Sequence, residues 1–248
     1  MKKIYSIALI ICLLATTVLL AGCGSSKSID EQFKADLMKG LSARWDLTDA
    51  DEEDLPDKSD YEAYIAAEYD IISKYKAETF EDKELSELAV KYIEILEESD
   101  ATLDDYGNSD KWAALWRDVR DDRVEVLLTL NEKLEIEFTD ETEQENWEGL
   151  LSEGKVVMSV RELMNTTTFE KTASNYGWNT YTAVVENTTK ETFDYFSFEI
   201  KLMDKDGVTV ETTSAYTENW APGGKVKFKF ETAANFSKME ITNCDYWF

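Results

Sequence analysis

The chain has 248 residues with 52 Asp and Glu against 26 Lys and Arg, which gives a net charge of −26, and it contains no histidine. Nucleic acids are bound through Lys and Arg that neutralise phosphates, so this charge excludes a nucleic-acid partner. The lack of histidine removes the commonest general base and metal ligand, which excludes most hydrolase mechanisms. We expect no catalytic residue, no metal and no cofactor.

The N-terminus has the features of an export signal, with two lysines followed by an apolar stretch over 4–20. The stretch ends in four residues that resemble the bacterial lipobox, Leu20, Ala21, Gly22 and Cys23. This resemblance implies that residues 1–22 are a lipoprotein signal peptide and that Cys23 becomes a diacylated, N-acylated first residue. Two or more acyl chains anchor a protein stably. We therefore expect an extracytoplasmic protein, held on the outer face of the cell membrane by the lipid on Cys23.

The acidic residues are concentrated in the first part of the chain. Residues 30–150 carry 38 acidic and 13 basic side chains, whereas residues 151–248 carry 14 and 10. Two parts of different charge predict two domains. We expect a tether over 23–28, an acidic helical domain over 29–152, a helical linker over 153–165 and a strand domain over 166–248.

Apolar residues recur at helical spacing through the first domain. The first helix is predicted over 29–45 from the residues Ile29, Phe33, Leu37, Leu41 and Trp45. Capping boxes at Ser59–Glu62 and Thr142–Glu145 predict two further helix starts, and helices are also expected over 82–99 and from 109 to 134. The short loops between them favour an antiparallel bundle.

The acidic segment 46–58 is interpreted as a loop. Asp49, Asp51 and Glu53 alternate as in a calcium-binding loop, but Asp54 occupies the sixth position, where a calcium loop needs glycine. A solvated loop is the better interpretation, and whether it binds cations stays open.

From residue 166 the composition becomes typical of strands, rich in Thr, Val, Phe, Tyr and Trp. Six strands are predicted, over 166–173, 178–187, 193–203, 208–217, 224–232 and 237–246. Val226, Phe228 and Phe230 alternate with lysines, which indicates a sheet with one buried and one solvent-exposed face. Short strands at this spacing favour a β-sandwich. The predicted fold class is therefore α+β multidomain, a helical bundle followed by an antiparallel β-sandwich.

Several segments of the strand domain resemble the FxLYD-type domain of Gram-positive surface lipoproteins. They are 178–186, Asn187–Thr189, Phe196–Asp204, Asp206–Gly207 and Trp220–Gly224. The segment Ile200–Asp204 corresponds to the family motif. It departs from that motif at two positions, where Ile200 replaces Phe and Met203 replaces Tyr. The resemblance implies an immunoglobulin-like β-sandwich without known catalytic residues.

Aromatic residues near the predicted sandwich loops are candidates for a binding surface, namely Trp178, Tyr216 and Trp220. Loops on a rigid sandwich are common binding sites, although packing in the core is the alternative for each of the three. Once Cys23 is lipidated and the signal is removed, Cys244 has no partner, so no disulfide forms and a buried, unreactive thiol is expected.

These features favour a non-catalytic binding or scaffold lipoprotein at the cell surface. Its expected partners are the membrane and a cell-surface protein or wall polymer, and its oligomeric state is left open. The alternative is a hydrolase of cell-wall glycan that uses two carboxylates. A solute-binding lipoprotein is disfavoured because strands and helices do not alternate along the chain.

Overall fold

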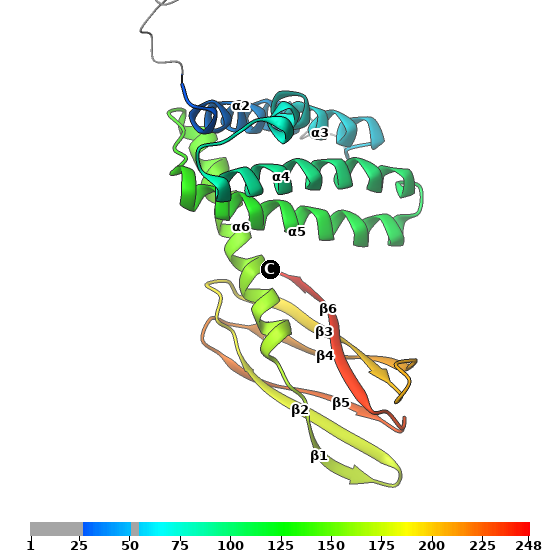
Figure 1. The fold of residues 1–248 in the computed structure, drawn as a ribbon. Helices are drawn as coiled ribbons and strands as arrows, with labels where there is room; N and C mark the ends of the chain where they lie inside the picture. Colours follow the sequence, from blue (N-terminus) through cyan, green and yellow to red (C-terminus); the bar gives the residue numbers. More distant parts are fainter. Residues whose placement is uncertain (1–26, 51–54) are drawn as a thin grey trace, which may run out of the picture.

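The computed structural model of the protein describes residues 27–50 and 55–248. Within these ranges the chain has an α+β arrangement, with five α-helices in its N-terminal half and six antiparallel strands in two sheets at its C-terminus (Figure 1). We call residues 27–50 and 55–166 the helical half and residues 167–248 the strand half. The lipobox with Cys23 and residues 51–54 of the acidic loop lie outside the described residues.

The helices follow the predicted order but differ in their limits. They are α2 (Ile29–Ala50), α3 (Lys58–Ile72), α4 (Lys83–Thr102), α5 (Ser109–Leu134) and α6 (Glu141–Thr166), with short 3₁₀ turns at Ser73–Ala77 and Leu103–Asp105. The first helix continues five residues beyond its predicted end at 45, so the start of the acidic segment 46–58 is helical rather than a loop. Phe33, Leu37 and Leu41 are buried, which confirms the predicted apolar face of α2.

Aspartates cap three of the helices. Asp57 accepts hydrogen bonds from backbone amides of α3 and forms a capping box with Asp60, and Asp140 accepts from the first turn of α6. The capping boxes predicted at Ser59–Glu62 and Thr142–Glu145 are therefore wrong by two residues. A carboxylate at the cap adds a charge interaction with the helix dipole that a hydroxyl lacks.

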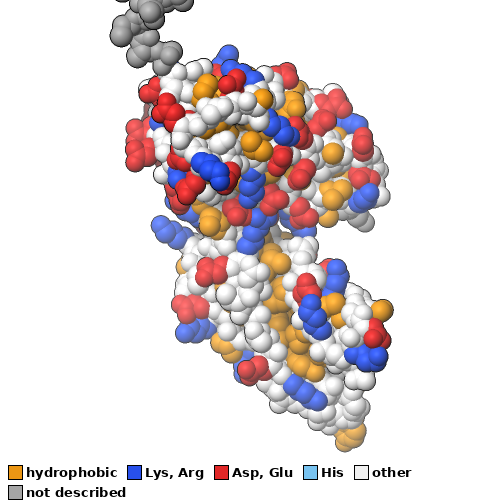
Figure 2. Space-filling model, viewed as in Figure 1, with side chains coloured by type: hydrophobic (Ala, Val, Ile, Leu, Met, Phe, Trp, Pro, Cys, Tyr) orange, Lys and Arg blue, Asp and Glu red, His pale blue; other side chains and the backbone are white. Residues whose placement is uncertain are grey.

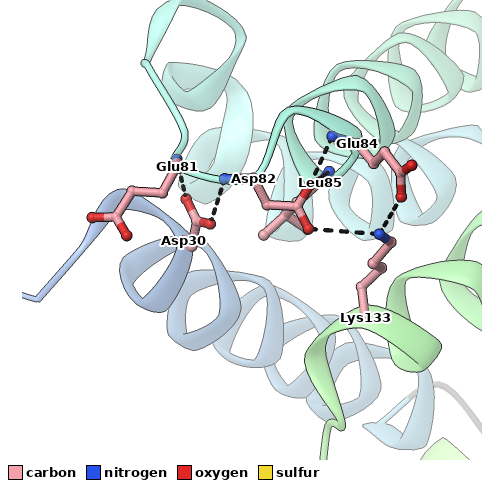
Figure 3. Close-up of polar contacts among 6 residues, drawn as sticks. All are labelled: Asp30, Glu81, Asp82, Glu84, Leu85 and Lys133. Atoms are coloured by element: carbon pink, nitrogen blue, oxygen red, sulfur yellow. Dashed lines mark hydrogen bonds and ion pairs between the residues drawn. The ribbon is translucent and has the colours of Figure 1, made fainter.

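The start of α4 is tied to two other helices (Figure 3). Asp30 of α2 accepts hydrogen bonds from the backbone amides of Glu81 and Asp82, at 2.9 and 3.0 Å. Asp82 caps α4, and Lys133 of α5 pairs with both Asp82 and Glu84. Ion pairs as exposed as these contribute little stability each, so their main effect is to fix where α4 begins.

The core of the helical half contains one buried carboxylate, that of Glu68 of α3, and Glu68 is 1% exposed. Arg44 of α2 and Arg123 of α5 bind the same Glu68 oxygen at 2.9 and 2.7 Å, and the Tyr92 hydroxyl of α4 donates to the other oxygen. Burial raises the pKa of Glu68, but the two guanidinium groups and the Tyr92 hydroxyl outweigh burial and hold that pKa below its ordinary value. The carboxylate therefore stabilises the fold at neutral pH, and this contribution is lost as the pH falls through the lowered pKa.

The six predicted strands are all present. They are β1 (Glu170–Asn175), β2 (Trp178–Glu186), β3 (Phe193–Met203), β4 (Thr209–Trp220), β5 (Lys225–Thr232) and β6 (Lys238–Trp247). One sheet has the order β1-β2-β5 and the other β4-β3-β6, and every pairing is antiparallel. Phe198 and Phe228 belong to different sheets and their ring centroids lie 4.9 Å apart, so both sheets contribute to one apolar core.

The first strand starts later than predicted because α6 continues to Thr166 as a single helix of 26 residues. Residues 153–165 are helical, as predicted, but they belong to α6 and do not form a separate linker. Trp147 of α6 is buried in the helical core, whereas Val160 and Leu163 are buried in the core of the strand half. Gly154 of α6 is a position of close packing against α5. A Cβ there would lie 2.7 Å from the Val124 carbonyl oxygen of α5.

We expect Gly154→Ala to destabilise the protein by about 1–3 kcal/mol, because the added methyl group forces α5 and α6 apart. Gly149→Ala is the matched control on the same helix, where a Cβ meets nothing within 4 Å. This control should stabilise by about 0.5–1 kcal/mol through helix propensity. Urea denaturation followed by circular dichroism measures both, and equal effects of the two substitutions would contradict the close contact.

Candidate functional site

A cavity of about 470 Å³ lies at the junction between the two halves. Its walls come from α5, α6, the end of β6 and the loop before β3, with Arg117, Arg120, Asp121, Gly149, Ser152, Glu153, Val156, Glu191, Cys244, Tyr246, Trp247 and Phe248. Figure 2 shows Lys and Arg side chains beside Asp and Glu side chains where the halves meet. This junction cavity is the candidate site.

Charged side chains of α5 form its polar wall. The helical spacing places Arg117, Arg120 and Asp121 outside the helical core, and in the structure all three line the junction cavity. Arg117 pairs across the junction with Asp245 of β6 at 2.5 Å, and Arg120 pairs with Glu153 of α6. The Arg117–Asp245 pair thus connects the two halves directly beside the cavity.

Asp121 has the most perturbed carboxyl group of this wall. Burial raises its pKa to about 6, against the opposing effect of the nearby arginines Arg120, Arg161 and Arg117. A carboxyl group with such a pKa can hold a proton near neutral pH, as a general acid must. Glu153 and Glu191 lie in the same wall.

Cys244 also lies in the wall and is buried, as expected from the sequence. Burial raises the pKa of its thiol to about 12, so the thiol stays protonated at neutral pH. It is the one free cysteine among the described residues, and it behaves as a small apolar side chain rather than as a nucleophile.

The last three residues supply the aromatic wall. Phe248 stacks on Phe193 with ring centroids 5.3 Å apart, and Trp247 stacks on Tyr195 at 4.1 Å with nearly parallel rings. The C-terminus therefore docks on its own strand half. Trp247 nevertheless stays 55% exposed, so part of its ring is available to a ligand in the junction cavity.

The three aromatic residues expected to form a binding surface do not lie together. Trp178 is 54% exposed beside the β1–β2 turn, at the end of the strand half away from the helices (Figure 1). Tyr216 is exposed on β4. Trp220 is 1% exposed and donates a hydrogen bond to the Gly224 carbonyl, so its assignment to the surface is wrong. It fills the core, which was the alternative for all three.

Tyr216 belongs instead to an aromatic row across one sheet. Its ring stacks on Tyr195 at 5.9 Å, and Tyr195 stacks on Trp247. Tyr216 and Trp247, at the two ends of the row, stay 61% and 55% exposed. The strand register that creates this row could not be predicted from composition.

One signal in the sequence could have indicated the junction. The chain has only five arginines among its 26 basic residues, and three of them, Arg117, Arg120 and Arg123, fall within seven positions of α5. Arginine binds carboxylates in a two-pronged geometry that lysine cannot reproduce. Such local enrichment of arginine predicts a polar contact surface on this helix.

No group of three or more His, Cys, Asp or Glu side chains within residues 27–50 and 55–248 is placed to hold a metal ion. Over the same residues, the helices are too polar or too short to cross a membrane. The chain matches no protein-family model, no curated protein and no solved structure.

Proposed function

We propose that the protein is a membrane-anchored extracytoplasmic lipoprotein, attached through lipid on Cys23, that acts as a non-catalytic binding module at the cell surface. The main support for a binding role is the junction cavity. Its volume of about 470 Å³ falls in the usual range for ligand sites, and it combines aromatic and charged walls. The lipobox at Leu20–Cys23 supports the location.

We also propose that the strand half is an immunoglobulin-like β-sandwich of the FxLYD type, following an antiparallel helical bundle. Two antiparallel sheets around one core support this fold. In the motif segment, Ile200 and Leu202 are fully buried, whereas Met203 is half-buried, which accounts for the tolerance of Met in place of Tyr. The buried Asn187 side chain donates to the carbonyls of Trp220 and Glu191 and holds two of the resembling segments together.

The walls of the cavity suit a ligand with an apolar face and a polar rim. Trp247 and Tyr246 offer ring surfaces, while Arg117 and Arg120 offer hydrogen-bond donors. Sugar rings have this combination of surfaces. A cell-wall glycan is therefore the ligand we favour, with a cell-surface protein as the other expected partner.

We expect Trp247→Ala to weaken the binding of soluble peptidoglycan fragments at least about tenfold, because tryptophan is among the residues that most often carry much of the affinity of a binding site. Trp178→Ala is the matched control, since Trp178 is equally exposed but lies outside the cavity wall. Titration calorimetry on the full chain in detergent measures both. Loss of binding in Trp178→Ala with binding intact in Trp247→Ala would place the site at the β1–β2 turn instead.

Anchoring predicts that Cys23→Ser abolishes labelling with palmitate and moves the protein out of the membrane fraction, because the acyl chains have no other attachment point. Cys244→Ser should keep both properties, since the thiol of Cys244 is buried in the strand half. Metabolic labelling and cell fractionation measure the outcome. Labelling that survives in Cys23→Ser would contradict the lipoprotein assignment.

The alternative function, a carboxylate-based glycan hydrolase, is favoured by one observation, the raised pKa of Asp121 in the cavity wall beside Glu153. A general acid and a second carboxylate are the parts that such an enzyme needs. The Arg120–Glu153 pair occupies the second carboxylate, which weighs against this role.

Replacing Asp121 by Asn separates the two functions. Between about pH 4 and the folded pKa of about 6, the folded chain binds more protons at Asp121 than the unfolded chain does, so stability falls as the pH rises through this window. Asp121→Asn should therefore stabilise the protein by about 1–2 kcal/mol at pH 7 and by much less at pH 3. Asp118→Asn, at an exposed position of the same helix, should have no such effect.

Urea denaturation at both pH values and the release of reducing ends from peptidoglycan are the measurements. If the protein is a binding module, neither the parent chain nor the two variants release reducing ends. Hydrolysis by the parent chain that is abolished in Asp121→Asn would establish the alternative.

A further inference from the structure

A second cavity, of about 290 Å³, lies within the helical half and shares Arg120 and Glu153 with the wall of the junction cavity. It is bounded by α2, α3, α4, α5 and α6, and three of the five arginines of the chain, Arg44, Arg120 and Arg123, lie in its wall. We call it the arginine cavity. Trp45 and Trp116 contribute aromatic surface to the same wall.

The charges around the arginine cavity do not balance. Arg120 pairs with Glu153, which leaves Arg44 and Arg123 to share the single carboxylate of Glu68. The group of five side chains therefore carries one positive charge in excess, inside a half of the chain that is otherwise strongly acidic. A cavity with excess guanidinium charge favours an anion over a neutral or cationic ligand.

Arg123 also has an unused donor. Arg123 is 7% exposed, and its Nη2 donates a hydrogen bond to Glu68. Its Nε is buried and has no hydrogen-bond partner among the described residues. A buried donor left unpaired costs about 1–3 kcal/mol. An acceptor that reaches this guanidinium group recovers part of that cost.

We propose that the arginine cavity binds a small organic anion, a carboxylate carried on an aromatic or apolar group. The guanidinium groups supply donors in the planar arrangement that matches a carboxylate. Tyr61 and Trp116, whose ring centroids lie 4.8 Å apart, supply apolar surface for the rest of the molecule. The volume holds a single ring and its carboxylate.

The test compares benzoate with benzamide, which has the same shape and no charge. Titration calorimetry on the full chain in detergent should give a dissociation constant for benzoate below about 1 mM. Benzamide should bind at least about tenfold more weakly, because it lacks the charge that the excess arginine attracts. Equal affinity for the two compounds, or no saturable binding of benzoate, would overturn the proposal.

Three variants locate the bound benzoate. Arg120 lines both cavities, whereas Arg117 lines the junction cavity and not the arginine cavity. Arg120→Gln should therefore weaken benzoate binding at least about fivefold, and Arg117→Gln should leave it unchanged. Thr48→Phe, which fills the arginine cavity from α2, should abolish binding, while Leu47→Phe at the adjacent exposed position should not.

Thermal denaturation confirms that each variant is folded before its affinity is interpreted. Loss of benzoate binding in Arg117→Gln would place the anion in the junction cavity and overturn the assignment to the arginine cavity. Retained affinity in Thr48→Phe would overturn it as well. Peptidoglycan binding should be unaffected by Thr48→Phe, so failure of the proposed function and failure of this inference are distinguishable.

Discussion

The carboxylate of Glu68 determines how the helical half is assembled. It lies on α3 and is bound by side chains from α2, α4 and α5, so four helices meet at one buried charge. Removing one partner of such a group leaves an uncompensated charge in the core, at a cost of about 3–5 kcal/mol. This cluster therefore fixes the position of α5 in particular. Since α5 contributes to the walls of both cavities, their shapes depend on the same interaction.

The periodic parts of the fold were predictable from the sequence. The spacing of Phe33, Leu37 and Leu41 identified the buried face of α2, and the alternation of Phe228 and Phe230 with lysines identified β5. These patterns are local, because a helix or strand that buries one face imposes its own period on the sequence. The predicted strand limits were correct to within three residues for the same reason, apart from the start of the first strand, which lies four residues later than predicted.

The errors came from features that depend on packing between elements. Residues 153–165 were expected to form a separate linker, yet they continue α6, and Gly154 lies where α5 and α6 pack closely. Trp220 suggested a surface aromatic, but the core of the strand half encloses it. The junction cavity combines α5, α6 and the C-terminus, and their meeting is set by the way the two halves dock. Neither periodicity nor composition carries that information.

The uninterrupted course of α6 has a mechanical consequence. Its 26 residues span about 39 Å as one rod, anchored at one end by Trp147 and at the other by Leu163. A chain joined by a flexible linker would let its parts swing apart, whereas this rod resists bending. The rod therefore limits how far the helical half and the strand half can bend relative to one another, since it is buried in the core of each.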